Sequence, residues 1–286
     1  MARKLGQLKQ ITYRRSTGIV VDLELKDRVA IVTGGSRGIG KAIAFALARE
    51  GANAALIARN MADAHAAAQE IASATGRRVQ AYSADTSSEE AVRAAFAQLA
   101  SDFGRIDILV NCAAQVAGQA PAPKFAEIHG ENFWAELNVK VLGYIRCAQA
   151  ATPHMQRAGW GRIINISGLA ARSTGSIIGT IRNISVAALT KNLADELGPS
   201  GINVTCVHPG ITRTEKTAGV LRQRAAASQT TPEEIERRIA DGNTIRHLVT
   251  AEEVANVVAF LASPKSLAIN GDAIAAGGGM PGAIYY

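Results

Sequence analysis

The stretch "TGGSRGIG" at residues 33–40 stands between the β-branched run "VAIVT" (29–33) and the Ala-rich segment "KAIAFALARE" (41–50). A glycine turn that joins a buried strand to the start of a helix is typical of a loop that binds a dinucleotide pyrophosphate. Gly34 permits the turn, Gly38 lets the backbone approach a phosphate, and Gly40 lets helix and strand pack closely. The unpaired N–H groups of the helix start favour an anion. We therefore predict cofactor contacts along the turn, from Gly34, Ser36, Arg37, Gly38, Ile39 and Gly40.

The same alternation of apolar run and amphipathic stretch continues along the chain. Further apolar runs lie at 54–58, 79–85, 105–111, 161–167, 202–210 and 271–278. Runs that do not alternate with polar residues suit strands buried on both faces. The repeat predicts an α/β, Rossmann-like, doubly wound parallel sheet of about seven strands, with helices on both faces and a single domain over 25–286.

Two helix starts are readable, and one segment breaks the alternation. "SSEEAV" (87–92) supplies a serine N-cap, and Thr250 with Glu253 forms a capping box. Stretches 137–158 and 183–198 are expected to be long helices that are apolar on one side. Packing on their own sheet is the simpler explanation of that side, but such helices often form a subunit face, and we predict a homodimer or homotetramer. The polar segment 211–248 reads as irregular. It follows the carboxyl end of a strand, where such sheets bind ligands, so we interpret it as a mobile substrate lid.

Composition excludes several classes of protein. The chain of 286 residues is 48% hydrophobic and 19% charged, which is typical of a globular domain rather than a disordered chain or coiled coil. No run approaches the ~18 apolar residues of a membrane span. Cys112, Cys147 and Cys206 lie far apart, so we expect no metal site and no disulfide framework, and a cytoplasmic location.

Residues 1–24 form a basic N-terminal extension, which we expect to be flexible. The formal net charge of the chain is +7, and much of it lies in the first 22 residues, which hold Arg3, Lys4, Lys9, Arg14 and Arg15 against Asp22 alone. Contact with nucleic acid or an acidic membrane is the alternative to a plain leader. We predict neither nucleic acid nor membrane as a partner, only a small-molecule substrate.

The spacing T-G-x-x-x-G-x-G resembles that of the short-chain dehydrogenase/reductase family, and the resemblance extends over residues 25–279. Further motifs follow in the family's order: "SADTS" (83–87), "NCAA" (111–114), "NVKVLG" (138–143), "HPGITRT" (208–214) and "INGDAIAAGGG" (269–279). The resemblance implies cofactor contacts beyond the glycine turn, with adenine held at Asp85 and the nicotinamide end held after residue 208. These residues are Asp85, Thr86, Asn111, Ala113, Asn183, Pro209, Gly210, Ile211 and Thr214.

Charge at the second strand favours NADP(H) over NAD(H). That strand ends "LIARN", where an acidic residue would bind a ribose 2′-hydroxyl and repel a 2′-phosphate. Ala58 and Arg59 stand there instead, and Arg37 lies in the glycine turn. Guanidinium groups bind phosphate bidentately, so we predict NADP, with NAD as the alternative if the arginines only stack on adenine.

The resemblance implies catalysis by Asn, Ser, Tyr and Lys, and this sequence departs from that set. The segment "ISVAALTKNLADELGPSGINV" (184–204) fixes the register, which places the lysine at Asn183 and the tyrosine at Gly179. The strand ends "NISG", so Gly168 takes the serine position and Ser167 is expected to point to the opposite face.

Asn138 is the clear survivor of the set. Ser167 and His208 are the other catalytic candidates, and an imidazole at 208 could titrate near neutrality. Arg182 could bind a carboxylate but is expected to be solvated. Tyr285 and Tyr286 could supply a phenol to a partner subunit.

Three functions follow. The first is an NADP(H)-dependent oxidoreductase with an altered proton relay, acting on an unknown carbonyl or alcohol. The second is a catalytically inactive nucleotide sensor or pseudoenzyme subunit. The third is a lyase or hydratase on the same fold, because a fold does not fix its chemistry.

Overall fold

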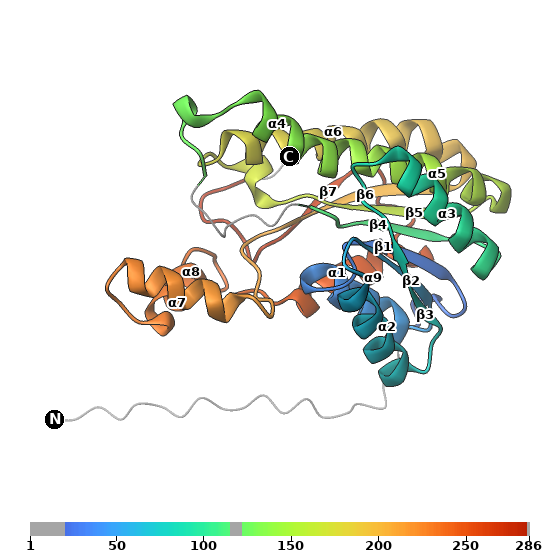
Figure 1. Cartoon of the computed structure of the whole chain (residues 1–286), viewed down its shortest axis with the longest axis horizontal. Coiled ribbons are helices and arrows are strands. Elements are labelled where there is room, and N and C mark those ends of the chain that lie inside the picture. Colours follow the sequence, from blue (N-terminus) through green and yellow to red (C-terminus); the bar gives the residue numbers. More distant parts are fainter. Residues whose placement is uncertain (1–20, 115–121, 285–286) are drawn as a thin grey trace.

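The computed structural model describes residues 21–114 and 122–284. Its centre is a parallel sheet of seven strands in the order β3-β2-β1-β4-β5-β6-β7 (Figure 1). The strands are β1 (Val29–Thr33), β2 (Asn53–Ala58), β3 (Val79–Ser83), β4 (Ile108–Asn111), β5 (Gly161–Ile166), β6 (Ile202–Pro209) and β7 (Ala273–Ala276). The chain order reverses between β1 and β4, and this is where open α/β sheets bind dinucleotides. The predicted fold class is confirmed.

Helices cover both faces of the sheet. Figure 1 shows α3, α4, α5 and α6 on one side and α1, α2 and α9 on the other. The bounds on the first side are α3 (Glu89–Phe103), α4 (Gly130–Leu137), α5 (Gly143–Ala158) and α6 (Ile177–Leu197). On the other side they are α1 (Gly38–Arg49), α2 (Met61–Thr75) and α9 (Ala251–Ala262). The predicted caps are present, since Ser88 caps α3 and the Thr250–Glu253 capping box opens α9.

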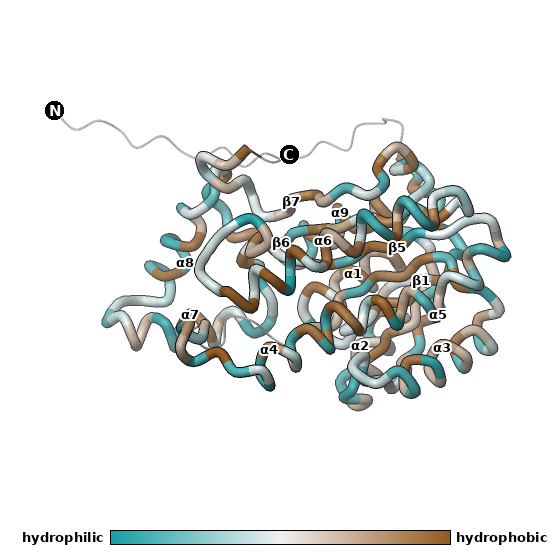
Figure 2. Tube along the Cα trace, turned by 90° about the horizontal axis from the view of Figure 1, so that it is seen from above, coloured by the Kyte–Doolittle hydropathy of each residue, from teal (hydrophilic) through white to brown (hydrophobic). Residues whose placement is uncertain are grey.

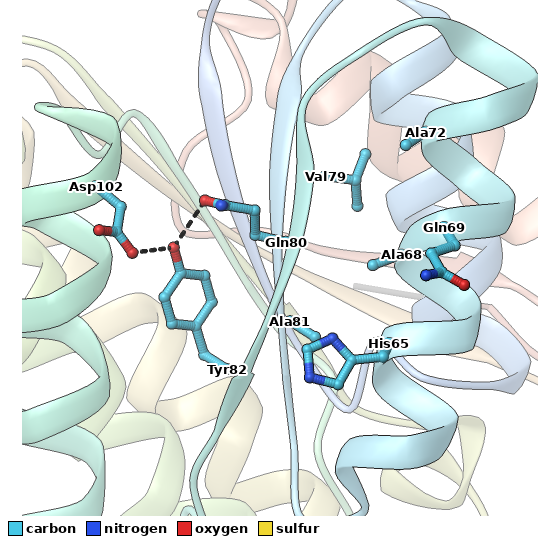
Figure 3. A pocket seen from close by; sticks show the side chains of 9 residues that line it. All are labelled: His65, Ala68, Gln69, Ala72, Val79, Gln80, Ala81, Tyr82 and Asp102. Carbon is cyan, nitrogen blue, oxygen red and sulfur yellow. Dashed lines mark hydrogen bonds between the residues drawn. The ribbon is translucent and has the colours of Figure 1, made fainter.

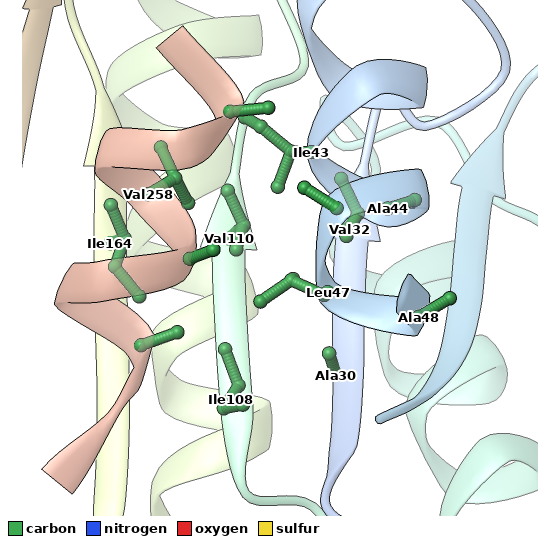
Figure 4. Packing of buried hydrophobic residues seen from close by; sticks show 14 of the residues in the cluster. Ala30, Val32, Ile43, Ala44, Leu47, Ala48, Ile108, Val110, Ile164 and Val258 are labelled. Carbon is green, nitrogen blue, oxygen red and sulfur yellow. The ribbon is translucent and has the colours of Figure 1, made fainter. Parts of the chain in front are cut away.

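Two apolar layers hold helices and sheet together. Figure 4 shows Ile43 and Leu47 of α1 and Val258 of α9 against Val32 and Val110 of the central strands. On the opposite face α3, α5 and α6 cover side chains such as Ile31 and Leu109. Successive strand residues therefore face different layers, and both layers exclude water. The strands accordingly appear hydrophobic along their length in Figure 2, while the surface helices carry hydrophilic stretches.

The sequence had suggested that segment 211–248 is irregular, and this expectation is wrong. The segment contains α7 (Thr217–Ala227) and α8 (Pro232–Asp241), which project beyond the sheet in Figure 1. The signals for α8 are local, because Thr231 caps it and Pro232 occupies its first turn. The two helices bury only a small cluster of their own, formed by Leu221, Ala225 and Ile235.

The long helix expected over 137–158 is interrupted. A π-helix occupies Asn138–Leu142 between α4 and α5, and α6 begins at Ile177, before the expected start at 183. Residues 1–20 of the basic arm and the terminal tyrosines lie outside the described residues. Among residues 21–114 and 122–284, every helix is too short or too polar to cross a lipid bilayer.

Asp107 provides a test of the fold. Its buried carboxylate accepts from the Val29 backbone N–H at 2.8 Å and from Arg105 at 2.7 Å. Asp107→Ala leaves the Val29 donor without its acceptor at the start of β1. We expect it to lower the free energy of unfolding by about 3 kcal/mol in urea titrations. Asp195→Ala, which removes an exposed i,i+4 pair with Lys191, should cost less than ~0.5 kcal/mol. Equal losses in the two variants would contradict this account.

Candidate functional site

The glycine turn is joined directly to the end of β4. The Thr33 hydroxyl oxygen accepts hydrogen bonds from the backbone N–H groups of Cys112 at 3.0 Å and Ala113 at 3.1 Å. Gly34 has φ +68°, which favours glycine, and a Cβ there would lie 3.1 Å from the Cα of Ala113. A Cβ on Gly40 would lie 2.2 Å from the Gly34 carbonyl oxygen. The turn therefore needs these glycines to pass between β1, β4 and α1.

The start of α1 faces the segment after β6. Gly38, at φ +55°, donates its N–H to the Glu215 carboxylate oxygens at 3.0 and 3.2 Å. Thr214 lies next to it, with its Cγ2 3.6 Å from where a Cβ on Gly38 would stand. The helix start therefore already binds an anionic group, the carboxylate of Glu215, as the unpaired N–H groups of a helix start favour. Ser36 and Ile39 are half-buried beside it, and Arg37 is exposed.

The predicted adenine end forms a small polar group. Arg59 lies 3.8 Å from Asp85, and both are solvent-accessible. Partial burial alone would raise the pKa of Asp85, but hydrogen bonds from Ser87 and the charge of Arg59 hold this pKa below its usual value. Thr86 is buried and donates to the Val139 carbonyl oxygen. No acidic side chain stands at the end of β2, where Ala58 is followed by Arg59.

Asn111 ties two strands together. Its Nδ2 donates to Asn165 Oδ1 at 2.9 Å, and Asn165 in turn donates to the Thr190 hydroxyl on α6. The Asn111 side chain is fully buried, and its Oδ1 has no partner among the described residues. The side chain therefore holds β4 against β5, and contact of Asn111 with a cofactor would involve its backbone.

Ser167 and Asn183 meet beyond the end of β5. The Ser167 hydroxyl donates to the Asn183 carbonyl oxygen at 2.9 Å and lies 3.3 Å from its Oδ1. Ser167 is buried, so its hydroxyl serves this contact with α6. Gly168 is next in the chain, and a Cβ there would lie 3.3 Å from Asn183 Nδ2. Gly179 lies one helical turn before Asn183, and its N–H donates to the Ser176 side chain that caps α6.

A lysine that the sequence reasoning missed completes this group. Lys140, in the π-helix, is only 5% exposed, and its Nζ donates to the Ser167 carbonyl oxygen and to Asn183 Oδ1, both at 3.0 Å. Burial lowers the pKa of Lys140 to about 8. Its position was a readable signal, because Lys140 stands about one turn before Tyr144, which lies on the face of α5 that packs into the core.

Asn138 is held in place by Arg146 of α5. Arg146 donates to Asn138 Oδ1 at 2.9 Å and to the Thr86 carbonyl oxygen at 3.1 Å. Asn138 begins the π-helix, a feature frequent at functional sites. The Arg146 side chain therefore links Asn138 in the π-helix to the loop after β3.

Two expectations are corrected by burial. His208 is 1% exposed, and burial together with the charges of Arg172 and Lys140 lowers its pKa to about 4, so it does not titrate near neutrality. It contacts the Cys206 sulfur at 3.8 Å. Arg182 is not solvated, because it is buried and forms an ion pair with Glu136 of α4.

The remaining predicted contacts lie at the carboxyl end of β6. Pro209 ends that strand, Gly210 packs against Gly277, and Ile211 is exposed. The Thr214 N–H donates to the Thr217 hydroxyl at the start of α7. These residues follow the strand on the same edge of the sheet as the glycine turn and Lys140.

A separate groove runs along β3, at the far edge of the sheet. Figure 3 shows it between α2 and β3, with the Tyr82 hydroxyl bonded to Asp102 and Gln80. This groove lies away from the glycine turn and from Lys140. Within the described part of the chain, no cluster of three potential metal ligands is present.

The fold and the glycine turn define a dinucleotide-binding α/β protein, and comparisons identify its family. The profile of the family described as enoyl-(acyl carrier protein) reductase matches residues 34–281. The short-chain reductase protein NovJ of Streptomyces niveus is 34% identical over 258 residues, which are 90% of this chain and 95% of that protein. The NADPH-dependent reductase BacG of Bacillus subtilis is 30% identical, over 89% of this chain and 98% of its own.

A solved structure agrees with these relatives. L-Sorbose reductase from Gluconobacter frateurii, in complex with NADPH and L-sorbose, superposes with a TM-score of 0.87 at 28% identity. The match covers 92% of this chain and 100% of the reductase. The chain belongs to the short-chain dehydrogenase/reductase family.

The buried imidazole makes stability depend on pH. Because the pKa of His208 is lowered from 6.5 to about 4, the unfolded chain binds a proton more readily than the folded one. His208 should therefore cost stability as the pH falls below 6.5, up to about 3 kcal/mol by pH 4. In urea unfolding, His208→Gln should not show this part of the loss of stability at acid pH. The exposed control His65→Gln should follow the wild type, and identical pH courses for all three proteins would contradict the assignment.

Proposed function

We propose that this protein is an NADP(H)-dependent oxidoreductase that interconverts a carbonyl compound and its alcohol through an altered proton relay. The observation that carries the cofactor choice is the pair of solvent-accessible arginines, Arg37 and Arg59, where an acidic residue would select NAD(H). Membership of a family of NAD(P)-dependent oxidoreductases supports the reaction class.

The residues present fit the nucleotide. A side chain on Gly34 or Gly40 would fill the space through which the turn passes, and the Gly38 N–H already holds a carboxylate where a pyrophosphate would bind. Arg37 and Arg59 would hold the 2′-phosphate, and Asp85 the adenine amino group. When bound, the nicotinamide supplies the hydride. The protein then has to orient the substrate oxygen and stabilise the charge that develops on it.

The proton relay is the altered part. Gly168, Gly179 and Asn183 stand where the family resemblance places serine, tyrosine and lysine. His208 has a lowered pKa and is neutral near pH 7, so it is a poor source of the proton. Loss of a general acid costs ~10²–10⁴ in rate, which slows reduction without preventing it. Nucleotide binding without turnover is the second candidate, and it is favoured by Gly179, which has no side chain to carry a proton.

Segment 211–248 is proposed to act as the substrate lid. It joins the end of β6 to α9, and its Glu215 contacts the glycine turn. We also propose a homodimer or homotetramer in the cytoplasm. Exposed apolar side chains on α6 support the association, among them Ile177, Ile181 and Ile184.

The cofactor assignment is tested by titrating NADPH and NADH, followed by a panel of carbonyl compounds at the nicotinamide absorbance. We expect NADPH to bind at least tenfold more tightly than NADH. Arg37→Ala with Arg59→Ala should weaken NADPH at least tenfold and leave NADH nearly unchanged, because only the former carries the 2′-phosphate. Arg93→Ala on α3 is the control for lost surface charge. A double variant that keeps its preference for NADPH would refute the assignment, and tight NADPH binding with no turnover would favour the second candidate.

Glu215 provides a second test at the phosphate end. Its carboxylate accepts from the Gly38 N–H, so a bound pyrophosphate must displace it and is repelled by its charge. Glu215→Gln should tighten NADPH binding roughly three- to fivefold in fluorescence titrations. Glu233→Gln, an exposed acid in the first turn of α8, is the matched control. Weaker binding by Glu215→Gln would show that the carboxylate assists the cofactor.

A further inference from the structure

The second half of the nucleotide cleft contains a buried charge without a counter-charge. Lys140 lies 95% buried, and its ammonium has two acceptors among the described residues, both uncharged oxygens. An ammonium has three donors, and burying it without an anion is costly. In residues 21–114 and 122–284 no carboxylate pairs with it. Buried charges of this kind gather at functional sites.

The surroundings of Lys140 do not neutralise it. Cys112 follows β4, Cys206 lies on β6 and Tyr144 lies on α5, and burial raises the pKa of each, to about 11 for the two thiols. All three groups are therefore neutral near pH 7. His208 is also neutral there, because its pKa is lowered. Arg172 is the other charged group near this cluster, and it adds positive charge.

Lys140 fixes the orientation of the Asn183 amide. An ammonium only donates hydrogen bonds, so the amide atom that faces Nζ must be the oxygen. The Ser167 hydroxyl lies on the same oxygen, at 3.3 Å. Nδ2 then takes the other side, where it is the atom nearest to the missing Cβ of Gly168. No acceptor from the described residues bonds to Nδ2.

The place of this pair in the fold connects it to the cleft. Residues 167 and 168 follow β5, and Cys112 follows β4, where its backbone N–H donates to the Thr33 hydroxyl at the end of β1. A dinucleotide that starts on the glycine turn crosses the gap between β1 and β4, so its second half lies over the ends of β4 and β5. Asn183 is buried, but because Gly168 has no Cβ, no side chain of that residue packs against Nδ2 on the side where that half would bind.

We propose that Lys140 is the ionisable positioning residue of this site: its ammonium locks the Asn183 amide so that Nδ2 donates to an oxygen of the ligand bound over β4 and β5. The inference rests on the proposed function. The oxygen belongs either to the nicotinamide half of the cofactor or to the substrate carbonyl. Above the pKa of Lys140 the amine gains a lone pair, can accept from Nδ2, and no longer fixes the amide.

The test compares wild type, Lys140→Met and Asn183→Asp by NADPH fluorescence between pH 7 and 9.5. The wild-type affinity should fall roughly five- to tenfold as the pH rises through about 8. Lys140→Met should be weaker by the same factor at pH 7 and independent of pH. Asn183→Asp keeps a partner for Lys140 but removes the Nδ2 donor, so it should be weak throughout. Lys191→Met, on the exposed face of α6, should follow the wild type.

Adenosine 2′,5′-bisphosphate, which lacks the nicotinamide half, serves as the second probe, and thermal midpoints report folding. Its affinity should be equal in all four proteins. A loss seen with NADPH alone assigns the oxygen to the cofactor, and a loss seen only in the rate of carbonyl reduction assigns it to the substrate. Equal NADPH affinity, pH course and rates in wild type and Lys140→Met would overturn the proposal. If the wild type does not bind NADPH, whether or not it binds the bisphosphate, the proposed function is overturned and this inference falls with it.

Discussion

The hydrogen bonds from Cys112 and Ala113 to the Thr33 hydroxyl join the two halves of the cleft. They link the ends of the neighbouring strands β1 and β4, where the chain order of the sheet reverses. Because all the strands are parallel, their carboxyl ends form one edge. The glycine turn, Lys140 and the end of β6 are therefore brought to one edge from positions more than 160 residues apart, and this buried hydroxyl holds the end of β4 against the turn.

The sheet was predictable because its strands are buried on both faces. Runs such as "VAIVT" and "GRIINIS" cannot alternate between polar and apolar residues, since each face meets an apolar layer. The glycine turn was predictable for a similar reason, because the backbone packs so closely around Gly34 and Gly40 that any side chain there would clash with it. The helices of segment 211–248 were not, because they bury only a few residues and their polar faces resemble a loop.

The catalytic half of the site was predicted less well, for a physical reason. Its groups come from the π-helix, the end of β5 and α6, and their contacts depend on the tertiary fold rather than on spacing along the chain. The sequence placed His208 at a strand end but did not reveal its burial, which removes its titration from the neutral range. Lys140 was overlooked because lysines are mostly exposed. Only the helical spacing from Lys140 to the buried Tyr144 indicated otherwise.

Asn183 and Lys140 are understood better as a pair than as two separate departures. A short amide at 183 does not itself carry charge, but its oxygen accepts the ammonium of Lys140 at 3.0 Å. The charge therefore reaches the same place from the π-helix before α5 instead of from α6. A hydrogen-bonded amide is polarised by a neighbouring cation, which strengthens its remaining N–H as a donor. What a lysine on α6 would do by direct contact, this site can do through an amide, provided that Lys140 remains protonated.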